Sequence, residues 1–228
     1  MKTYELVLQR VEADLGAGRL RLGDRLPGER GLAESLGVSR ATVREAIRVL
    51  EAMGVIRTGV GSGPDAGAVI VAEPSAALSS ALRLHLATSY LPIRDIVRTR
   101  VLLESWSVAE AAAADSVDLA RARALLDAMD DVSLDAEEFH RLDAAFHVEL
   151  ATVTGNVLIA AVMSALRQAI HGYVMTAVPT LDDWAATAAG LRLEHRAVLA
   201  AIEERRPDAA ADLVTKHIEG FYRAARFG

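Results

Sequence analysis

Residues 29–54 contain two short helix patterns joined by a tight turn, and this arrangement limits the fold more than any other part of the sequence. The first pattern, ERGLAESL, ends at Gly37, where a left-handed backbone conformation costs least. Ser39 then stands where a helix N-cap is expected. The second pattern, RATVREAIRVLEAM, carries Val43 and Leu50 at the helical period. Two short helices separated by so few residues predict a helix–turn–helix unit.

The flanking segments complete this unit. Residues 3–15 repeat apolar side chains at a helical period, which predicts a preceding helix. VIRT and GAVIVA are β-branched runs on either side of the glycine-rich GVGSGPDAG, and they predict a hairpin with a long loop. A helix, a short helix, a turn, a helix and a two-stranded wing together make a winged helix–turn–helix domain, which we place at residues 1–72.

The chain from Ala76 onward has helical periodicity and no strand-like alternation. Proline, glycine and polar clusters break it into segments. We expect a linker at 73–78 and, over 79–228, an antiparallel all-helical bundle of about seven helices. The expected helices are 76–89, 93–114, 118–130, 135–154, 157–177, 182–205 and 208–226. The fold class is therefore mainly α.

Charge divides the chain at the same place. Residues 1–72 hold ten basic and nine acidic residues, whereas the remainder holds fifteen and twenty-two. Eight arginines and five acids lie between Arg19 and Arg57, so phosphate binding is plausible only in the first third. The absence of cysteine excludes disulfides and thiolate metal sites. No apolar run of about 18 uncharged residues is present, so we expect no membrane span and a cytoplasmic location.

The start of the second helix presents side chains suited to reading DNA. Arg40 and Arg44 lie one turn apart with Thr42 between them, and arginine can fork onto the O6 and N7 of guanine or pair with phosphate. Arg30 precedes them on the shorter helix. Taken alone, these arginines fit a solvated face paired with acids such as Glu45 equally well. The turn and the wing together favour the major groove of DNA.

A carboxylate and three histidines are candidates for a metal site in the bundle. Asp143 and His147 lie four residues apart, on one face of a helix. His195 and His217 lie on the last two expected helices, which a bundle can bring alongside. Such a ligand set suits Zn, Ni or Mn better than Mg or Ca. The residue types alone also fit buried histidines satisfied by hydrogen bonds. His140 lies on nearly the same side of its helix.

Arg100 lies on a mostly apolar helix and needs an anionic partner if it is buried. Glu104, four residues later, is one candidate, and the carboxylate of a bound ligand is the other. We find no HExxH sequence, nucleophile elbow or phosphate loop, so we expect no enzyme. A metal-dependent hydrolase-like bundle with an accessory DNA-binding module remains the alternative function.

Two sets of motifs resemble a known family. GDRLPGERGLAESLGVSRATVREAIRVLEAMGVI resembles the DNA-binding domain of the GntR family of bacterial transcription regulators. RTRVLLE, DAAFHVELATVTGN, LEHRAVLAAIEERRPDAAA and KHIEGF resemble the FCD effector domain of its FadR-like subfamily. The wing departs from the family's shorter hairpin. The resemblance implies DNA contacts by Arg30, Ser39, Arg40, Thr42, Arg44 and the wing-tip residue Gly61, metal ligation by Asp143, His147, His195 and His217, and effector binding by Arg100.

These observations lead to one functional expectation. The chain is expected to be a ligand-responsive transcription regulator, acting as a repressor, that binds a palindromic double-stranded DNA operator as a homodimer. Its bundle is expected to hold a divalent transition metal and to sense a small carboxylic acid there, beside Arg100.

Overall fold

The computed structural model describes residues 3–59, 67–88 and 90–225. The chain divides into two compact units, Met1–Leu78 and Ser79–Gly228. The two units are described separately below.

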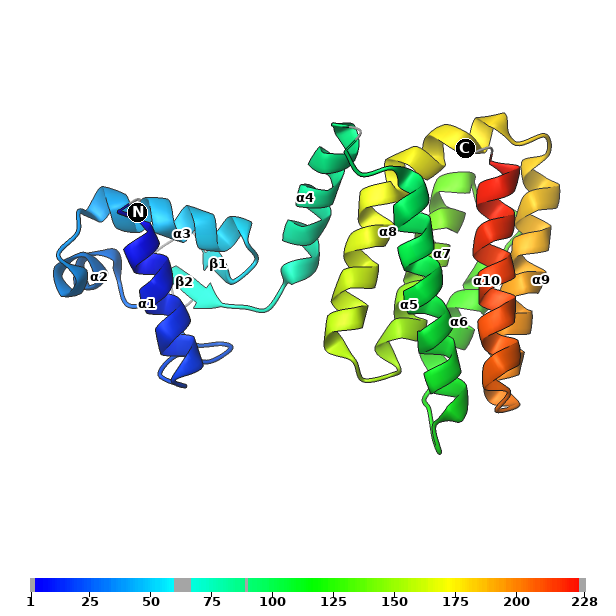
Figure 1. Ribbon diagram of the computed structural model, residues 1–228, viewed down its shortest axis with the longest axis horizontal. Coiled ribbons are helices and arrows are strands. Elements are labelled where there is room, and N and C mark those ends of the chain that lie inside the picture. The colour runs from blue at the N-terminus through cyan, green and yellow to red at the C-terminus, as the bar shows by residue number, and fades with distance from the viewer. Residues whose placement is uncertain (1–2, 60–66, 89, 226–228) are drawn as a thin grey trace. The chain divides into compact units, whose positions relative to one another are not determined.

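The N-terminal unit is a winged helix–turn–helix, as the sequence predicted (Figure 1). Gly37 ends its second helix in the left-handed conformation, with φ at 64°, and the Ser39 side chain caps the third helix by accepting the backbone N–H of Thr42. The strands pair antiparallel with Ile56 opposite Ile70. The expected wing-tip residue Gly61 lies outside the described residues. The elements are α1 (Glu5–Gly16), α2 (Glu29–Leu36), α3 (Arg40–Ala52), β1 (Ile56–Gly59) and β2 (Gly67–Ile70).

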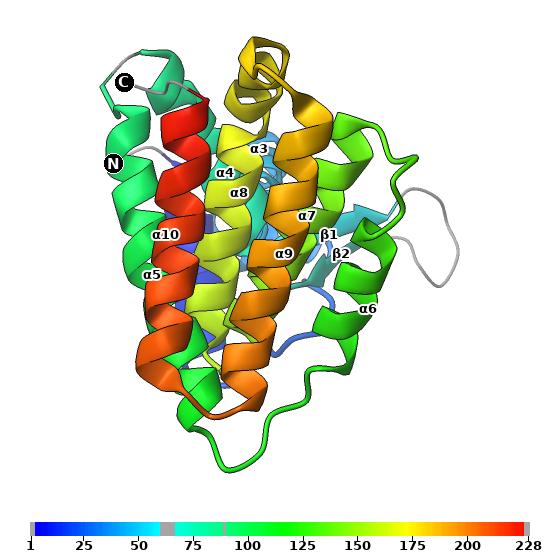
Figure 2. The same cartoon turned by 90° about the vertical axis from the view of Figure 1, so that its right-hand side faces the viewer.

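Seven α-helices follow within the described residues, and six of them pack around one core in an elongated bundle (Figure 2). Helix α5 lies against α10, so segments distant in sequence become neighbours, and α7 lies against α8, which follows it in the chain. Helix α4 begins at Pro74, two residues before the start expected at residue 76, because proline is tolerated in the first turn of a helix. The helices are α4 (Pro74–Ala87), α5 (Ile93–Ala113), α6 (Ala120–Met129), α7 (Ala136–Thr152), α8 (Val157–Ala177), α9 (Trp184–Glu203) and α10 (Pro207–Ala224), with a 3-10 turn at Val178–Thr180.

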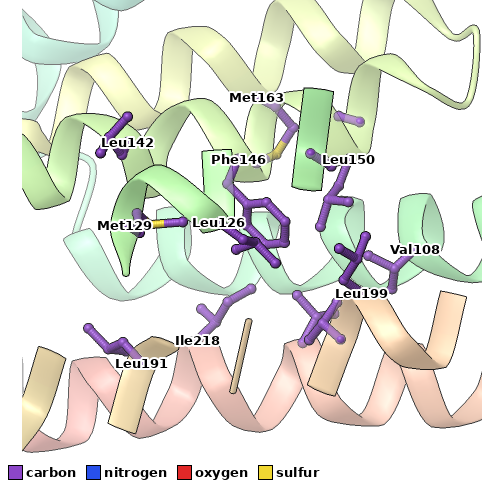
Figure 3. Close-up of a cluster of buried hydrophobic side chains, with 14 of the residues drawn as sticks. Val108, Leu126, Met129, Leu142, Phe146, Leu150, Met163, Leu191, Leu199 and Ile218 are labelled. Carbon is purple, nitrogen blue, oxygen red and sulfur yellow. The ribbon is translucent and has the colours of Figure 1, made fainter. Parts of the chain in front are cut away.

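The bundle core is apolar and continuous (Figure 3). Phe146 of α7 is fully buried and points among side chains that include Leu126 and Leu150. Asp135 and Asn156 fix the starts of α7 and α8 by accepting backbone N–H groups. The first residues of α7 and α8 are therefore fixed. This sets the position of each α7 side chain along the bundle.

Helix α8 and the turn after it, Val157–Thr180, are long and apolar enough to cross a membrane by length and composition alone. A core helix of a globular bundle meets the same criterion. Arg167 lies near the middle of α8, is buried, and forms an ion pair with Asp143 of α7. Buried apolar residues of α8, among them Met163, Leu166 and Ile170, belong to the bundle core.

Candidate metal centre and DNA-binding surface

Four predicted ligands meet at one point inside the bundle. One ligand atom from each of Asp143, His147, His195 and His217 lies within 4.8 Å of the others, and all four residues are buried. The Nε2 atom of His217 is 3.2 Å from Nε2 of His147 and 3.1 Å from Nε2 of His195. Oδ1 of Asp143 is 3.0 Å from Nε2 of His195. Helices α7, α9 and α10 supply these side chains, as the sequence predicted.

The outer nitrogens of two of these imidazoles face carboxylates. Nδ1 of His147 is 2.5 Å from Oε2 of Glu104, and Nδ1 of His217 is 2.8 Å from Oε2 of Glu194. A carboxylate at Nδ1 favours the tautomer that carries its proton there, which leaves the Nε2 lone pair directed at the centre. Lone pairs that face each other at 3.2 Å repel unless a proton or cation lies between them. The donor set therefore fits a divalent transition metal.

Burial keeps His195 and His217 neutral, whereas Asp143 stays charged. Burial lowers the pKa of His195 to about 3 and also lowers the pKa of His217. Burial alone would raise the pKa of Asp143, but the adjacent guanidinium of Arg167 and the neighbouring imidazoles outweigh this effect and hold it well below its usual range. Neutral imidazoles and an ionised carboxylate are the forms that bind a metal.

Arg167 is a site residue that the sequence analysis missed. Its guanidinium donates to Oδ2 of Asp143, while Oδ1 of the same carboxylate faces the histidines. The available signal was a single charge in the otherwise apolar run VLIAAVMSALRQAIHGYV, which argues for a buried partner. Glu194 is a second such residue, because its half-exposed carboxylate lies against the predicted ligand His217.

Arg100 is buried, and both of its side-chain hydrogen bonds are internal. Its Nε donates to Oε1 of Glu104 at 2.8 Å, and its Nη1 donates to the Tyr222 hydroxyl at 2.9 Å. Glu104 was the first of the two anionic partners considered for Arg100 from the sequence, and it does pair with Arg100. Burial alone would lower the pKa of Arg100, but the charge of Glu104 outweighs this and raises it, so the guanidinium stays charged.

A cavity of about 20 Å³ adjoins these groups. Arg100, Arg167 and Tyr222 contribute polar atoms to its wall, and Leu191 and Ile218 contribute apolar surface. A volume of this size accommodates about one water molecule. A carboxylate group is larger than one water molecule, so binding one there would require side chains to move.

His140 and His171 lie at the edge of the centre. His140 was expected at the surface or behind the ligands. It is 9% exposed, lies 3.5 Å from Asp143 and has its pKa lowered to about 4 by burial. Its ring stacks on that of His171, which lines an open groove of about 610 Å³ between α7 and α8. His140 is therefore a buried neighbour of the predicted ligand Asp143.

The predicted DNA-reading residues gather on α2 and at the start of α3. Arg30, Arg40 and Arg44 are exposed, while the Oγ atoms of Ser39 and Thr42 lie 2.9 Å apart. Opposite these residues, Val43, Ala46 and Leu50 of α3 are buried against the domain core. The third helix thus presents arginines on its solvent side from a firmly packed position.

Some of these arginines have acidic neighbours, as the solvated-face interpretation predicted. Arg44 is 3.4 Å from Glu29, and Arg30 is 3.5 Å from Glu34. Both pairs are largely exposed, and such pairs contribute little to stability, so phosphate or a base edge can replace the acid. Arg57, uncertain from sequence, pairs with Glu73 beside the wing.

A winged helix–turn–helix joined in sequence to a helical bundle with a buried polar centre defines a class of one-component DNA-binding regulators. Residues 3–64 match the gntR family of bacterial regulatory proteins, and residues 95–220 match the FCD domain. The chain therefore belongs to the gntR family, in the branch that carries an FCD domain, and it is a DNA-binding transcription regulator.

Curated relatives agree with this assignment. The chain is 29% identical over 224 residues to the Uxu operon regulator of Haemophilus influenzae, covering 96% of this chain and 80% of that one. It is 27% identical to the Glc operon transcriptional activator of Escherichia coli, covering 94% and 85%. A solved GntR protein from Streptococcus agalactiae shares the fold, with a TM-score of 0.63, 24% identity and coverage of 97% and 100%. These matches point to a regulator rather than to the hydrolase-like alternative.

Proposed function

We propose that the bundle holds a divalent transition metal (Zn, Ni or Mn) at Asp143, His147, His195 and His217, and senses a small carboxylic acid there. The observation that carries this proposal is the convergence of three Nε2 atoms and one carboxylate oxygen, with carboxylates behind two of the imidazoles. Four protein ligands leave room for a further ligand when a metal is five- or six-coordinate.

Buried charge supports an acidic effector. Within the described residues the buried charged side chains are Arg100, Arg167, Glu104 and Asp143, which balance one another, and burial keeps the nearby His195 and His217 neutral. A divalent cation would add two positive charges, partly offset by half-exposed Glu194. Excess positive charge in a low-dielectric interior is stabilised by an anion. Arg100 beside the cavity would bind the carboxylate of that anion.

We further propose that two chains bind a palindromic operator together. The bundle offers an apolar face, since Leu102 and Trp106 lie one turn apart on α5 and are exposed, as are Val157 and Leu158 at the start of the neighbouring α8. A twofold dimer would place two recognition helices in successive major grooves. Replacing Leu102 and Trp106 with glutamate should then yield monomers that bind a single half-site weakly.

We propose that the protein represses transcription and that the effector relieves this repression. We also propose that the protein is cytoplasmic. One relative is the Glc operon transcriptional activator, so the sign of regulation in this protein needs a direct test. Effector binding would shift the population of DNA-competent protein only by its preference for one state. Transcription from an operator-bearing template, measured with and without effector, gives that sign.

A binding screen tests the sensing role. Metal-loaded protein is heated with hydroxy acids, dicarboxylic acids and sugar acids, and the melting temperature and the affinity for operator DNA are recorded together. At least one acid class should raise the melting temperature and change DNA affinity, and Arg100→Met should abolish both effects. An apolar effector that acts without metal would contradict the proposal.

A further inference from the structure

Glu104 is a buried carboxylate that touches both parts of the proposed sensor. Its Oε1 accepts from Nε of Arg100 at 2.8 Å, and its Oε2 lies 2.5 Å from Nδ1 of His147. The side chain is 3% exposed, on α5 between its two partners. It is held ionised because the charge of Arg100 and the nearby His147 outweigh the effect of burial and lower its pKa.

We propose that Glu104 is the positioning residue that couples the metal site to Arg100, so that each site changes the affinity of the other. This inference rests on the proposed function. A carboxylate at Nδ1 orients a histidine and raises the basicity of its Nε2, which strengthens metal binding. An anion arriving at Arg100 competes with Glu104 for the guanidinium. Glu104 then interacts more strongly with His147, and the metal is held more tightly. By thermodynamic reciprocity, the metal also favours the anion.

The other two histidines offer no such connection. The carboxylate behind His217 belongs to Glu194, whose side chain is 50% exposed and forms no ion pair with an arginine among the described residues. Nδ1 of His195 is buried, and no carboxylate forms an ion pair with it among the described residues. Glu194 is therefore a matched comparison: a carboxylate behind a ligand histidine, without a link to Arg100.

Zinc affinity of the full-length protein, measured by competition with a chromophoric chelator, tests the coupling. Glu104→Gln should lower zinc affinity about 10- to 100-fold and shift the visible absorption of the Co²⁺-substituted protein. Glu110→Gln, at an exposed position on the same helix, should change neither. If zinc affinity and the Co²⁺ spectrum of Glu104→Gln match those of the wild type, the inference is wrong.

Arg100→Met, which touches no predicted ligand, supplies the decisive comparison. It should change zinc affinity at least about fivefold in the wild-type background and less than about twofold in the Glu104→Gln background. In the Glu194→Gln background its full effect should remain. An equal effect with and without Glu104 would overturn the coupling while leaving the metal site intact.

Folding of the variants is checked by thermal unfolding without metal. Glu104→Gln leaves the charge of Arg100 buried and unpaired, whereas the double variant with Arg100→Met removes both charges and is expected to fold. If Glu104→Gln does not fold, the zinc affinity of the double variant is compared with that of Arg100→Met alone. The difference is the zinc affinity that is lost with Glu104. Wild-type protein that binds no zinc would overturn both this inference and the proposed function.

Discussion

At the scale of single residues, Asp143 shows how one side chain serves the bundle and the candidate metal centre together. Its Oδ2 accepts from Arg167 of α8, and its Oδ1 faces the histidines. The ion pair keeps the carboxylate charged in a buried place, where an unpaired charge is costly. The ligand is therefore in its binding form before any metal arrives.

Removing Arg167 should expose this dual role. Arg167→Met leaves Asp143 buried without its main partner, so metal-free protein should lose about 3 kcal/mol of unfolding free energy. Zinc supplies a new positive partner and should recover much of the loss. Urea unfolding with and without zinc measures both effects. Arg141→Met, which removes an exposed arginine paired with Glu138, should cost less than about 0.5 kcal/mol. A comparable loss in the two variants would show that the buried pair has no special role.

Replacing Arg40 or Arg44 tests the predicted DNA contacts of α3. Arg40→Ala or Arg44→Ala should weaken operator binding by about 1–3 kcal/mol if the arginine reads a base. A phosphate contact would instead lower affinity for all sequences and reduce the salt dependence. Arg10→Ala, on α1 and paired with Asp14, is the control. Fluorescence anisotropy over a range of salt concentrations distinguishes these cases, and wild-type affinity in both variants would refute the assignment of α3.

Some residues of the candidate centre could be predicted from the sequence, and others could not. Asp143 and His147 share a helix face by local spacing, which a sequence reveals. Their convergence with His195 and His217 was expected from the resemblance and the bundle. Glu104 behind His147 and Arg167 behind Asp143 depend on the rotation of α5 and α8, which periodicity does not define. Long-range side-chain partners of this kind are set by packing.

At the scale of elements, helix positions followed the sequence closely because the chain marks its breaks with strong local signals. Pro92, Pro179 and Pro207 lie at or beside helix boundaries, and the side chain of Asp183 caps α9. The start of α4 was the exception, because it lies two residues earlier than expected. A proline reads as a break, yet Pro74 occupies the first turn of α4, where its missing N–H is harmless.

Gly54, between α3 and the wing, tests the local geometry. Its φ is +69°, and an added Cβ would collide with the carbonyl oxygen of Glu73. Gly54→Ala should therefore destabilise the protein by about 2 kcal/mol or more. Gly31→Ala, inside α2 with open space around it, should be neutral or stabilising by up to about 1 kcal/mol. Thermal unfolding of both variants makes the comparison, and equal stability would show that the turn can relax.

At the scale of the whole molecule, the free energy of unfolding should decrease as the pH falls. Burial lowers the pKa of His140 to about 4 and that of His195 to about 3, from 6.5. The unfolded chain therefore binds protons first as pH falls below about 6.5, and stability declines progressively toward pH 4. At pH 5 each such histidine should cost about 2 kcal/mol. Urea unfolding of metal-free protein at several pH values measures the decline, and His140→Gln should reduce its slope. An unchanged stability between pH 7 and 5 would contradict neutral burial.

The metal centre is the central claim, and its direct test is thermal unfolding of chelator-treated protein before and after addition of Zn²⁺, Ni²⁺ or Mn²⁺. Because a metal that binds only the folded chain stabilises it, a concentration 100 times the dissociation constant should add about 2.7 kcal/mol. We predict a concentration-dependent rise in melting temperature that is lost in His147→Ala and retained in His171→Ala. A melting temperature that none of the metals raises, or one that rises equally in His147→Ala, would contradict the account.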